Sequence, residues 1–127
     1  MAKRKILIID DEKLVRTVLT DLLQMKGYTV VAAEDGPTGL AAAMKEKPNA
    51  IILDVTMPGM DGFEVCEALK KDVATTGIPV IIVTASDDAH LTKKAFKAGA
   101  DFTLVKAGKP EGLLSTLHLA LSLARPS

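Results

Sequence analysis

Apolar residues fall into five short runs separated by longer segments with helical spacing. The runs cover residues 5–9, 29–33, 50–53, 79–83 and 102–105. In three of them, at residues 6–9, 51–53 and 80–83, apolar side chains follow one another without alternation. Such runs are typical of parallel strands that are covered on both faces. The pattern therefore predicts five strands, of which at least three are buried.

Helices are predicted between these strands and after the last one. The first begins near Leu14, carries its apolar residues on one face and ends at Gly27. The others are expected at residues 39–47, 63–71, 89–98 and 110 to about 124. Because strand and helix alternate five times, we predict one α/β domain over residues 1–127, doubly wound around a parallel sheet with right-handed crossovers. Pro126 and Ser127 are expected to form a short tail.

The composition is that of an ordinary globular domain. Of the 127 residues, 48% are apolar and 25% are charged, and the 16 basic residues balance the 16 acidic ones. With no net charge, the chain has no overall field to attract nucleic acid or an anionic membrane, so we expect neither as a direct partner. The single cysteine, Cys66, cannot form an internal disulfide, and no apolar segment is long enough to span a bilayer. We therefore expect a cytoplasmic protein.

Polar residues stand where four of the predicted strands end. Asp10 and Asp11 follow the first strand, Asp54 the third, Thr84 the fourth and Lys106 the fifth. Binding sites in such sheets form beyond the carboxyl ends of the strands, which lie along one edge. Three carboxylates, a hydroxyl and an ammonium group should therefore converge.

This combination of groups suits phosphoryl transfer. Clustered carboxylates repel one another unless a cation lies between them, and Mg²⁺ prefers a few carboxylates together with waters. A carboxylate can act as a nucleophile and form an aspartyl-phosphate, whose charge the metal and Lys106 would offset. Each residue also has an ordinary structural role: Asp10 or Asp11 could cap a helix, and Lys106 could be a surface lysine. The prediction depends on all of them ending strands of one sheet.

Over essentially its whole length the chain resembles the receiver domains of bacterial response regulators, the signalling proteins of two-component systems. The resemblance depends on the following motifs: Asp10-Asp11, the segment 54–62, Val83-Thr84-Ala85, and Lys106. It implies a flavodoxin-like (βα)5 fold with strand order 2-1-3-4-5. It also implies a phosphorelay switch that takes a phosphoryl group from phosphohistidine.

The resemblance assigns a metal site and a phosphoacceptor. Asp54 would accept the phosphoryl group. Asp11 and Asp54 would bind Mg²⁺ directly, together with the backbone carbonyl of Thr56, and Asp10 would act through a water. The partners implied are a sensor histidine kinase or a histidine phosphotransfer protein, and a downstream protein target.

Other positions acquire supporting roles from the same resemblance. Thr84 would move toward the phosphoryl group, and Lys106 would pair with it. The small side chain of Ala85 would leave the site open to the donor. Thr56 and Ser86 match the positions that tune slow autodephosphorylation. The chemistry implied is thus directed at the protein itself, and no enzymatic turnover of a separate substrate is expected.

Two positions depart from the family pattern. The switch position, three residues before the lysine, is usually aromatic and here is Thr103, while Phe102 beside it should point to the other face of the sheet. The residue after the lysine is usually proline and here is Ala107. A Lys-Pro pair follows at residues 109–110, so Lys109 is an alternative to Lys106. We hypothesise that the altered loop 107–110 changes the choice of phosphodonor more than the chemistry.

Three other functions compete with this interpretation. The chain could be an interaction module without regulated phosphorylation, which Thr103 favours and the complete acidic site opposes. A flavin- or nucleotide-binding protein would need a glycine- or hydroxyl-rich loop after the first strand, and residues 10–12 are all acidic instead. An aspartate-dependent phosphatase would need a second acid just beyond the nucleophile, where Thr56 stands.

Overall fold

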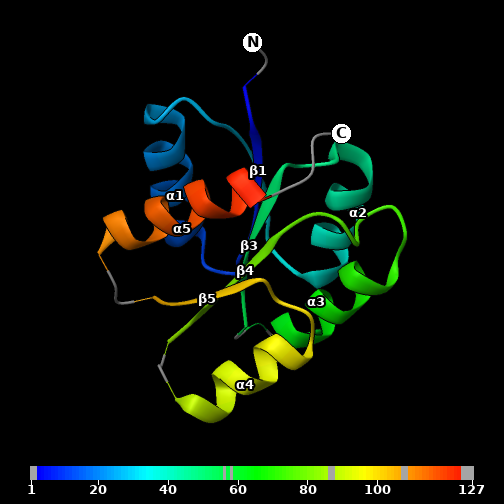
Figure 1. Ribbon diagram of the computed structural model, residues 1–127. Coiled ribbons are helices and arrows are strands. Elements are labelled where there is room, and N and C mark those ends of the chain that lie inside the picture. The colour runs from blue at the N-terminus through cyan, green and yellow to red at the C-terminus, as the bar shows by residue number, and fades with distance from the viewer. Residues whose placement is uncertain (1–2, 56, 58, 86–87, 107–108, 124–127) are drawn as a thin grey trace.

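The computed structural model describes residues 3–55, 57, 59–85, 88–106 and 109–123. In this part of the chain five parallel strands alternate with five helices (Figure 1). The strands are β1 (Lys5–Ile9), β2 (Thr29–Ala33), β3 (Ala50–Asp54), β4 (Val80–Thr84) and β5 (Phe102–Val105). The helices are α1 (Lys13–Met25), α2 (Gly36–Glu46), α3 (Gly62–Lys71), α4 (Ala89–Lys97) and α5 (Pro110–Leu123). The strand order β2-β1-β3-β4-β5 confirms the predicted fold class.

The strand ends differ slightly from those predicted. β3 includes Asp54, and β4 runs one residue later than expected and includes Thr84. Beyond these ends the pairing continues, because the backbone amide of Val55 donates to the carbonyl of Val83 at 3.3 Å. Asp54 and Thr84 are therefore held by the sheet itself.

The second helix begins three residues earlier than predicted. Its first residue is Gly36, because the carboxylate of Asp35 caps the helix by accepting from the backbone amide of Thr38 at 2.9 Å. Pro37 lies in the first turn, where a missing backbone N–H leaves no helical hydrogen bond unmade. The alanine-rich segment suggested a later start, but the cap formed by Asp35 sets the beginning of the helix.

Two apolar layers cover the sheet, one on each face. α1 and α5 lie on one face and α2, α3 and α4 on the other (Figure 1). Side chains along each strand point alternately to the two layers. On β1, Ile6 and Ile8 pack with α1 and α5, whereas Leu7 and Ile9 pack with the other layer. None of the described helices is long and apolar enough to cross a lipid bilayer.

A close backbone contact ties α3 to the end of β3. A Cβ atom placed on Gly62 would lie against the carbonyl oxygen of Asp54 and only 2.5 Å from the Cα of Val55. The amide of Gly62 also donates to the carbonyl of Val55 at 3.1 Å. The first residue of α3 must therefore lack a side chain for Asp54 to keep its place.

We predict that Gly62→Ala destabilises the domain by about 1–3 kcal/mol, because backbone atoms cannot yield to the added methyl group. The matched control is Gly112→Ala in α5, where a Cβ atom would meet nothing within 4 Å. That change should stabilise the helix by roughly 0.5–1 kcal/mol. Urea unfolding of both variants measures the difference, and equal stabilities would contradict the close contact.

Candidate functional site

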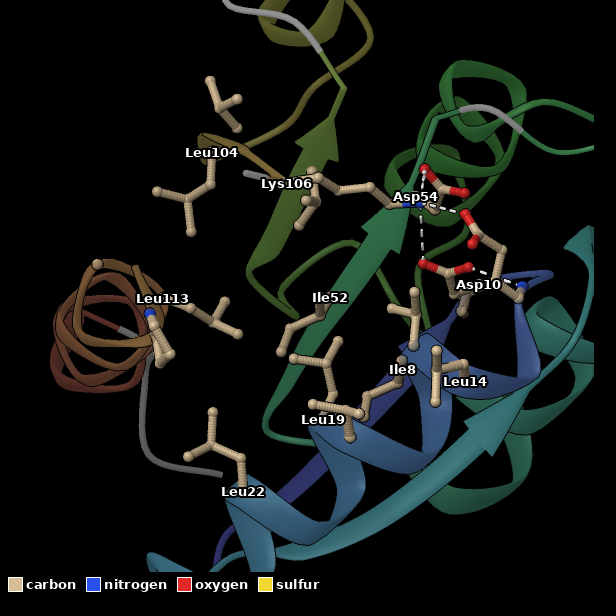
Figure 2. A pocket seen from close by; sticks show the side chains of 18 of the residues that line it. Ile8, Asp10, Leu14, Leu19, Leu22, Ile52, Asp54, Leu104, Lys106 and Leu113 are labelled. Atoms are coloured by element: carbon tan, nitrogen blue, oxygen red, sulfur yellow. Dashed lines mark hydrogen bonds and ion pairs between the residues drawn. The ribbon is translucent and has the colours of Figure 1, made fainter. Parts of the chain in front are cut away.

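The side chain of Lys106 is surrounded by carboxylates at the carboxyl edge of the sheet. Its Nζ lies 3.3 Å from Oδ1 of Asp54, 3.5 Å from Oδ2 of Asp10 and 3.2 Å from Oε1 of Glu12. Figure 2 shows the side chains of Asp10, Asp54 and Lys106 meeting at one end of a cleft. Asp54 and Asp10 are only 2% and 4% exposed, so the ammonium group compensates two buried charges.

Backbone and side-chain hydrogen bonds fix the acidic side of the site. The amide of Asp10 donates to the carbonyl of Ala33 at 3.1 Å, which continues the pairing of β1 with β2. Its carboxylate Oδ1 accepts from the amide of Glu12 at 2.9 Å and so turns the chain into α1. The guanidinium of Arg16 donates to the carbonyl of Asp10 at 2.8 Å. The backbone of Asp10 is therefore fixed through both its amide and its carbonyl group.

Lys106 comes to this edge because β5 pairs with β4 up to its last residue. Val105 is in register with Thr84, and the amide of Lys106 donates to the carbonyl of Thr84 at 2.6 Å. Thr84 is itself buried at the end of β4. The backbone thus delivers the ammonium group toward Asp54, two strands away.

Three consecutive acids could hold a divalent cation. Asp10, Asp11 and Glu12 each offer a carboxylate oxygen, and these oxygens lie within 4.8 Å of one another. Asp10 is buried, whereas Asp11 and Glu12 are exposed. Hard oxygen donors in a partly open cluster are what Mg²⁺ accepts while keeping several waters. The residues present therefore fit this metal.

Glu12 is the site residue that the sequence interpretation did not select. It is the residue before α1, and its carboxylate reaches Lys106, the residue directly after β5. The only available signal was its position as the third of three successive acids after β1. A contact across 94 residues of chain depends on the sheet order, which brings β1 and β5 to the same edge.

The other predicted residues lie around this center. Ala85 is exposed directly after Thr84. Thr103 is half-buried on β5, and Phe102 packs with the α1 and α5 layer, as expected for a side chain on the opposite face. Lys109 is exposed near the start of α5, and the ion pairs to the site carboxylates are made by Lys106. The predictions for Thr56, Ser86 and Ala107 concern positions outside the described residues.

Burial and ionic contacts act in opposite directions on the ammonium group of Lys106. Partial burial alone would lower the pKa of Lys106, because it disfavours the charged form. The hydrogen bond to Glu12, and then the charges of Asp54 and Asp10, outweigh this effect and raise the pKa above its ordinary value. Lys106 is therefore a permanent cation at neutral pH.

The family model for the response regulator receiver domain matches residues 6–118. The chain belongs to this family. Protein PilH of Pseudomonas aeruginosa is 39% identical over 118 residues, which cover 93% of this chain and 98% of that protein. Among solved structures, the chemotaxis protein CheY4 of Vibrio cholerae has a TM-score of 0.89 and 35% identity, and the match covers 94% of this chain and 99% of that one.

Other curated relatives are longer than this receiver domain. The probable transcriptional regulator ycf27 of Porphyridium aerugineum is 37% identical over 95% of this chain, but the match covers only 49% of that protein. The chain thus spans about half the length of several relatives that it matches. Receiver domains act in two-component signalling, and this membership makes the chain a signalling domain of that type.

We predict that a carbon-13 NMR titration of the lysine Cε atoms finds a higher pKa for Lys106 than for exposed lysines. Because the folded-state pKa is raised, the ion pairs stabilise the fold fully below the ordinary lysine pKa and lose this effect as pH rises through the folded-state value. Glu12→Gln should lower the pKa of Lys106. The control Glu111→Gln, an exposed change in the first turn of α5, should not. Equal effects of both changes would contradict the Glu12 contact.

Proposed function

We propose that this receiver domain is a phosphoacceptor switch in which Asp54 takes a phosphoryl group. The observation that carries the proposal is the buried carboxylate of Asp54 at the end of β3, 3.3 Å from the ammonium of Lys106. A carboxylate of this kind is a competent nucleophile when nearby cations offset the charge of the incoming group. Ion pairing with a lysine from β5 supplies one such cation.

The proposed donor is a phosphohistidine on a histidine kinase or a histidine phosphotransfer protein. A carboxylate oxygen of Asp54 forms a bond to phosphorus as the bond from phosphorus to the imidazole nitrogen breaks, and the imidazole keeps the electron pair. In slow autodephosphorylation, a water oxygen attacks phosphorus, the bond to Asp54 breaks, and inorganic phosphate leaves. Both steps act on the domain itself.

The acidic cluster supports a role for Mg²⁺ in this chemistry. Asp10, Asp11 and Glu12 present oxygens within 4.8 Å of one another, and Asp54 shares Lys106 with Asp10 and Glu12. We propose that Asp11 and Asp54 bind the metal directly and that Asp10 acts through a water. When bound, the metal would supply positive charge beside the phosphoryl oxygens. Thr56 would complete the site through its backbone carbonyl.

The residues at the end of β4 would respond to the phosphoryl group. Thr84 carries the hydroxyl proposed to hydrogen-bond it, and the exposed Ala85 leaves the approach open to a donor. Ser86 and Thr56 are proposed to set the rate of autodephosphorylation. Phosphorylation would shift the population toward a form that binds a downstream protein target. The size of this shift is limited by how much more favourably that form interacts with the phosphoryl group than the other form does. With Thr103 at the switch position, this shift proceeds without an aromatic side chain there.

We expect incubation with acetyl phosphate and Mg²⁺ to add the mass of one phosphoryl group to the intact protein. The gain should disappear without Mg²⁺ and in Asp54→Asn, because the amide cannot act as the nucleophile. Asp21→Asn is the matched control, since Asp21 is an exposed residue of α1, and it should label like the wild type.

Two results would contradict this function. Labelling of Asp54→Asn would move the acceptor elsewhere. Absence of labelling in a folded protein, both with acetyl phosphate and with phosphohistidine donors while a control receiver is labelled, would favour an interaction module without regulated phosphorylation.

A second experiment distinguishes the two candidate lysines. Lys106→Gln should slow labelling by acetyl phosphate by about tenfold or more, because it removes the cation beside Asp54. Lys109→Gln removes the same charge from an exposed position near α5 and should leave the rate within about twofold of the wild type. The opposite order of rates would assign the site lysine to Lys109.

A further inference from the structure

An apolar cleft lies directly beside the candidate site, between α1, α5 and the sheet. Its volume is about 540 Å³. Figure 2 shows Ile8 and Ile52 on the sheet side, Leu19 on α1 and Leu113 on α5 turned toward the same space. One end of the cleft is formed by Asp10, Asp54 and Lys106, and the remainder is mostly aliphatic. A second pocket, beside Lys70 and Asp101, is smaller, with a volume of about 350 Å³.

The cleft exists because the helices cover this face of the sheet incompletely. Val83 and Leu104 are neighbours in register on β4 and β5, and both remain half-buried. On the opposite face Ile82 of β4 is fully buried beneath the other helical layer. Strands of a parallel sheet are normally covered on both faces. The uncovered side chains therefore form the floor of a binding-sized depression.

The rim of the cleft is apolar and open to solvent on the α1 side. Leu14 is 74% exposed and Val18 is 55% exposed, and both line the cleft. Val83 and Leu104 on the floor are half-buried, so part of their surface stays open to the cleft. A flat macromolecular surface would contact the rim without reaching the floor, whereas a small molecule entering between the helices would contact both. Depth thus favours a small ligand.

The charges at the polar end indicate what kind of small ligand fits. Lys106 is already paired with Glu12, Asp10 and Asp54. The other cation that lines the cleft, Lys109, is exposed to solvent, which screens its charge. An anionic ligand would approach two buried carboxylates, and a cationic ligand would compete with Lys106 for them. An uncharged molecule avoids both costs and gains from the removal of apolar surface from water.

We propose that this cleft is a binding site for a small, uncharged, apolar molecule. Small-molecule sites usually have volumes of about 300–1,000 Å³, are mostly apolar and have a few polar groups at one end. An apolar cavity of about 150 Å³ already binds benzene. The larger volume here therefore suits a molecule of roughly two or three aromatic rings or an equivalent aliphatic chain.

Occupancy of the cleft is coupled to the phosphorylation site through shared walls. Asp10, Asp54 and Lys106 line the cleft and also form the candidate phosphorylation site. A ligand that contacts these groups differently before and after phosphorylation must alter phosphorylation, and phosphorylation must alter its affinity by the same factor. This coupling depends on the proposed function, whereas binding itself does not.

Binding is tested on the full chain without any phosphodonor, with phenylnaphthylamine as an uncharged probe that fluoresces in apolar surroundings. We expect saturable binding that is tighter than that of anilinonaphthalene sulfonate, which has a similar apolar body and a negative charge. Methyl NMR shifts should move at Ile8, Ile52 and Leu104, which line the cleft. Tighter binding of the sulfonate, or shifts confined to residues outside the cleft, would overturn the proposal.

Filling the cleft should abolish probe binding. Leu113→Phe places a larger side chain in the space and should weaken binding by about tenfold or more. Leu119→Phe is the matched control: the same change on the same helix, at a residue that is 48% exposed and does not line the cleft. Leu22→Phe fills the space from α1 and replaces the first variant if that one is unfolded by circular dichroism. Equal affinities of filled and control variants would overturn the site.

Coupling is measured separately. Phosphorylation of the wild type by acetyl phosphate should change its Kd for the probe by about twofold or more. Asp54→Asn, which cannot be labelled, should show no change in Kd on the same treatment. Asp54→Asn should still bind the probe. If labelling fails in every variant but binding follows the predicted pattern, the proposed function is wrong and the site stands. If the probe binds with the same Kd before and after phosphorylation, the coupling is wrong.

Discussion

The architecture of the site depends on one cation held among carboxylates that would otherwise repel one another. Asp10 and Asp54 are almost fully buried on neighbouring strands, and burial of two uncompensated charges would be costly. Lys106 supplies the compensation from β5, and Glu12 adds a third carboxylate from the entry to α1. The ion pairs therefore join the first, third and fifth strands at one edge of the sheet, where phosphoryl chemistry would require positive charge.

The two faces of the sheet are packed to different degrees. On the side of α2, α3 and α4, close contacts such as that of Gly62 with the backbone of Asp54 leave no room even for a methyl group. On the side of α1 and α5, half-buried residues of β4 and β5 border an open cleft. Asp54 is thus closely packed against α3 on one face of the sheet and borders the open apolar cleft on the other.

The difference in packing between the two faces affects which helices could transmit a change at the candidate site. Many receivers place an aromatic residue where this chain has Thr103, and the neighbouring Phe102 packs into the α1 and α5 layer instead. Lys106, which is paired with Asp54, also lines the cleft between those helices. The cleft on the α1 and α5 side therefore borders the carboxylate of Asp54, and a ligand bound there would contact the same carboxylates.

The sequence by itself determined the order of the helices and strands, and it correctly placed Asp54, Thr84 and Lys106 at the ends of strands along one edge of the sheet. Short consecutive apolar runs are typical of parallel strands covered on both faces, and polar residues at the carboxyl ends of such strands lie along one edge. The start of the second helix was predicted less well, because α2 begins at Gly36, where the carboxylate of Asp35 caps it, and not at residue 39. Only the tertiary structure decided that Glu12 contacts Lys106. The two residues are 94 positions apart, and the contact depends on the positions of their side-chain ends in space. The cleft, likewise, follows from how closely two helices approach a sheet, a distance that periodicity does not encode.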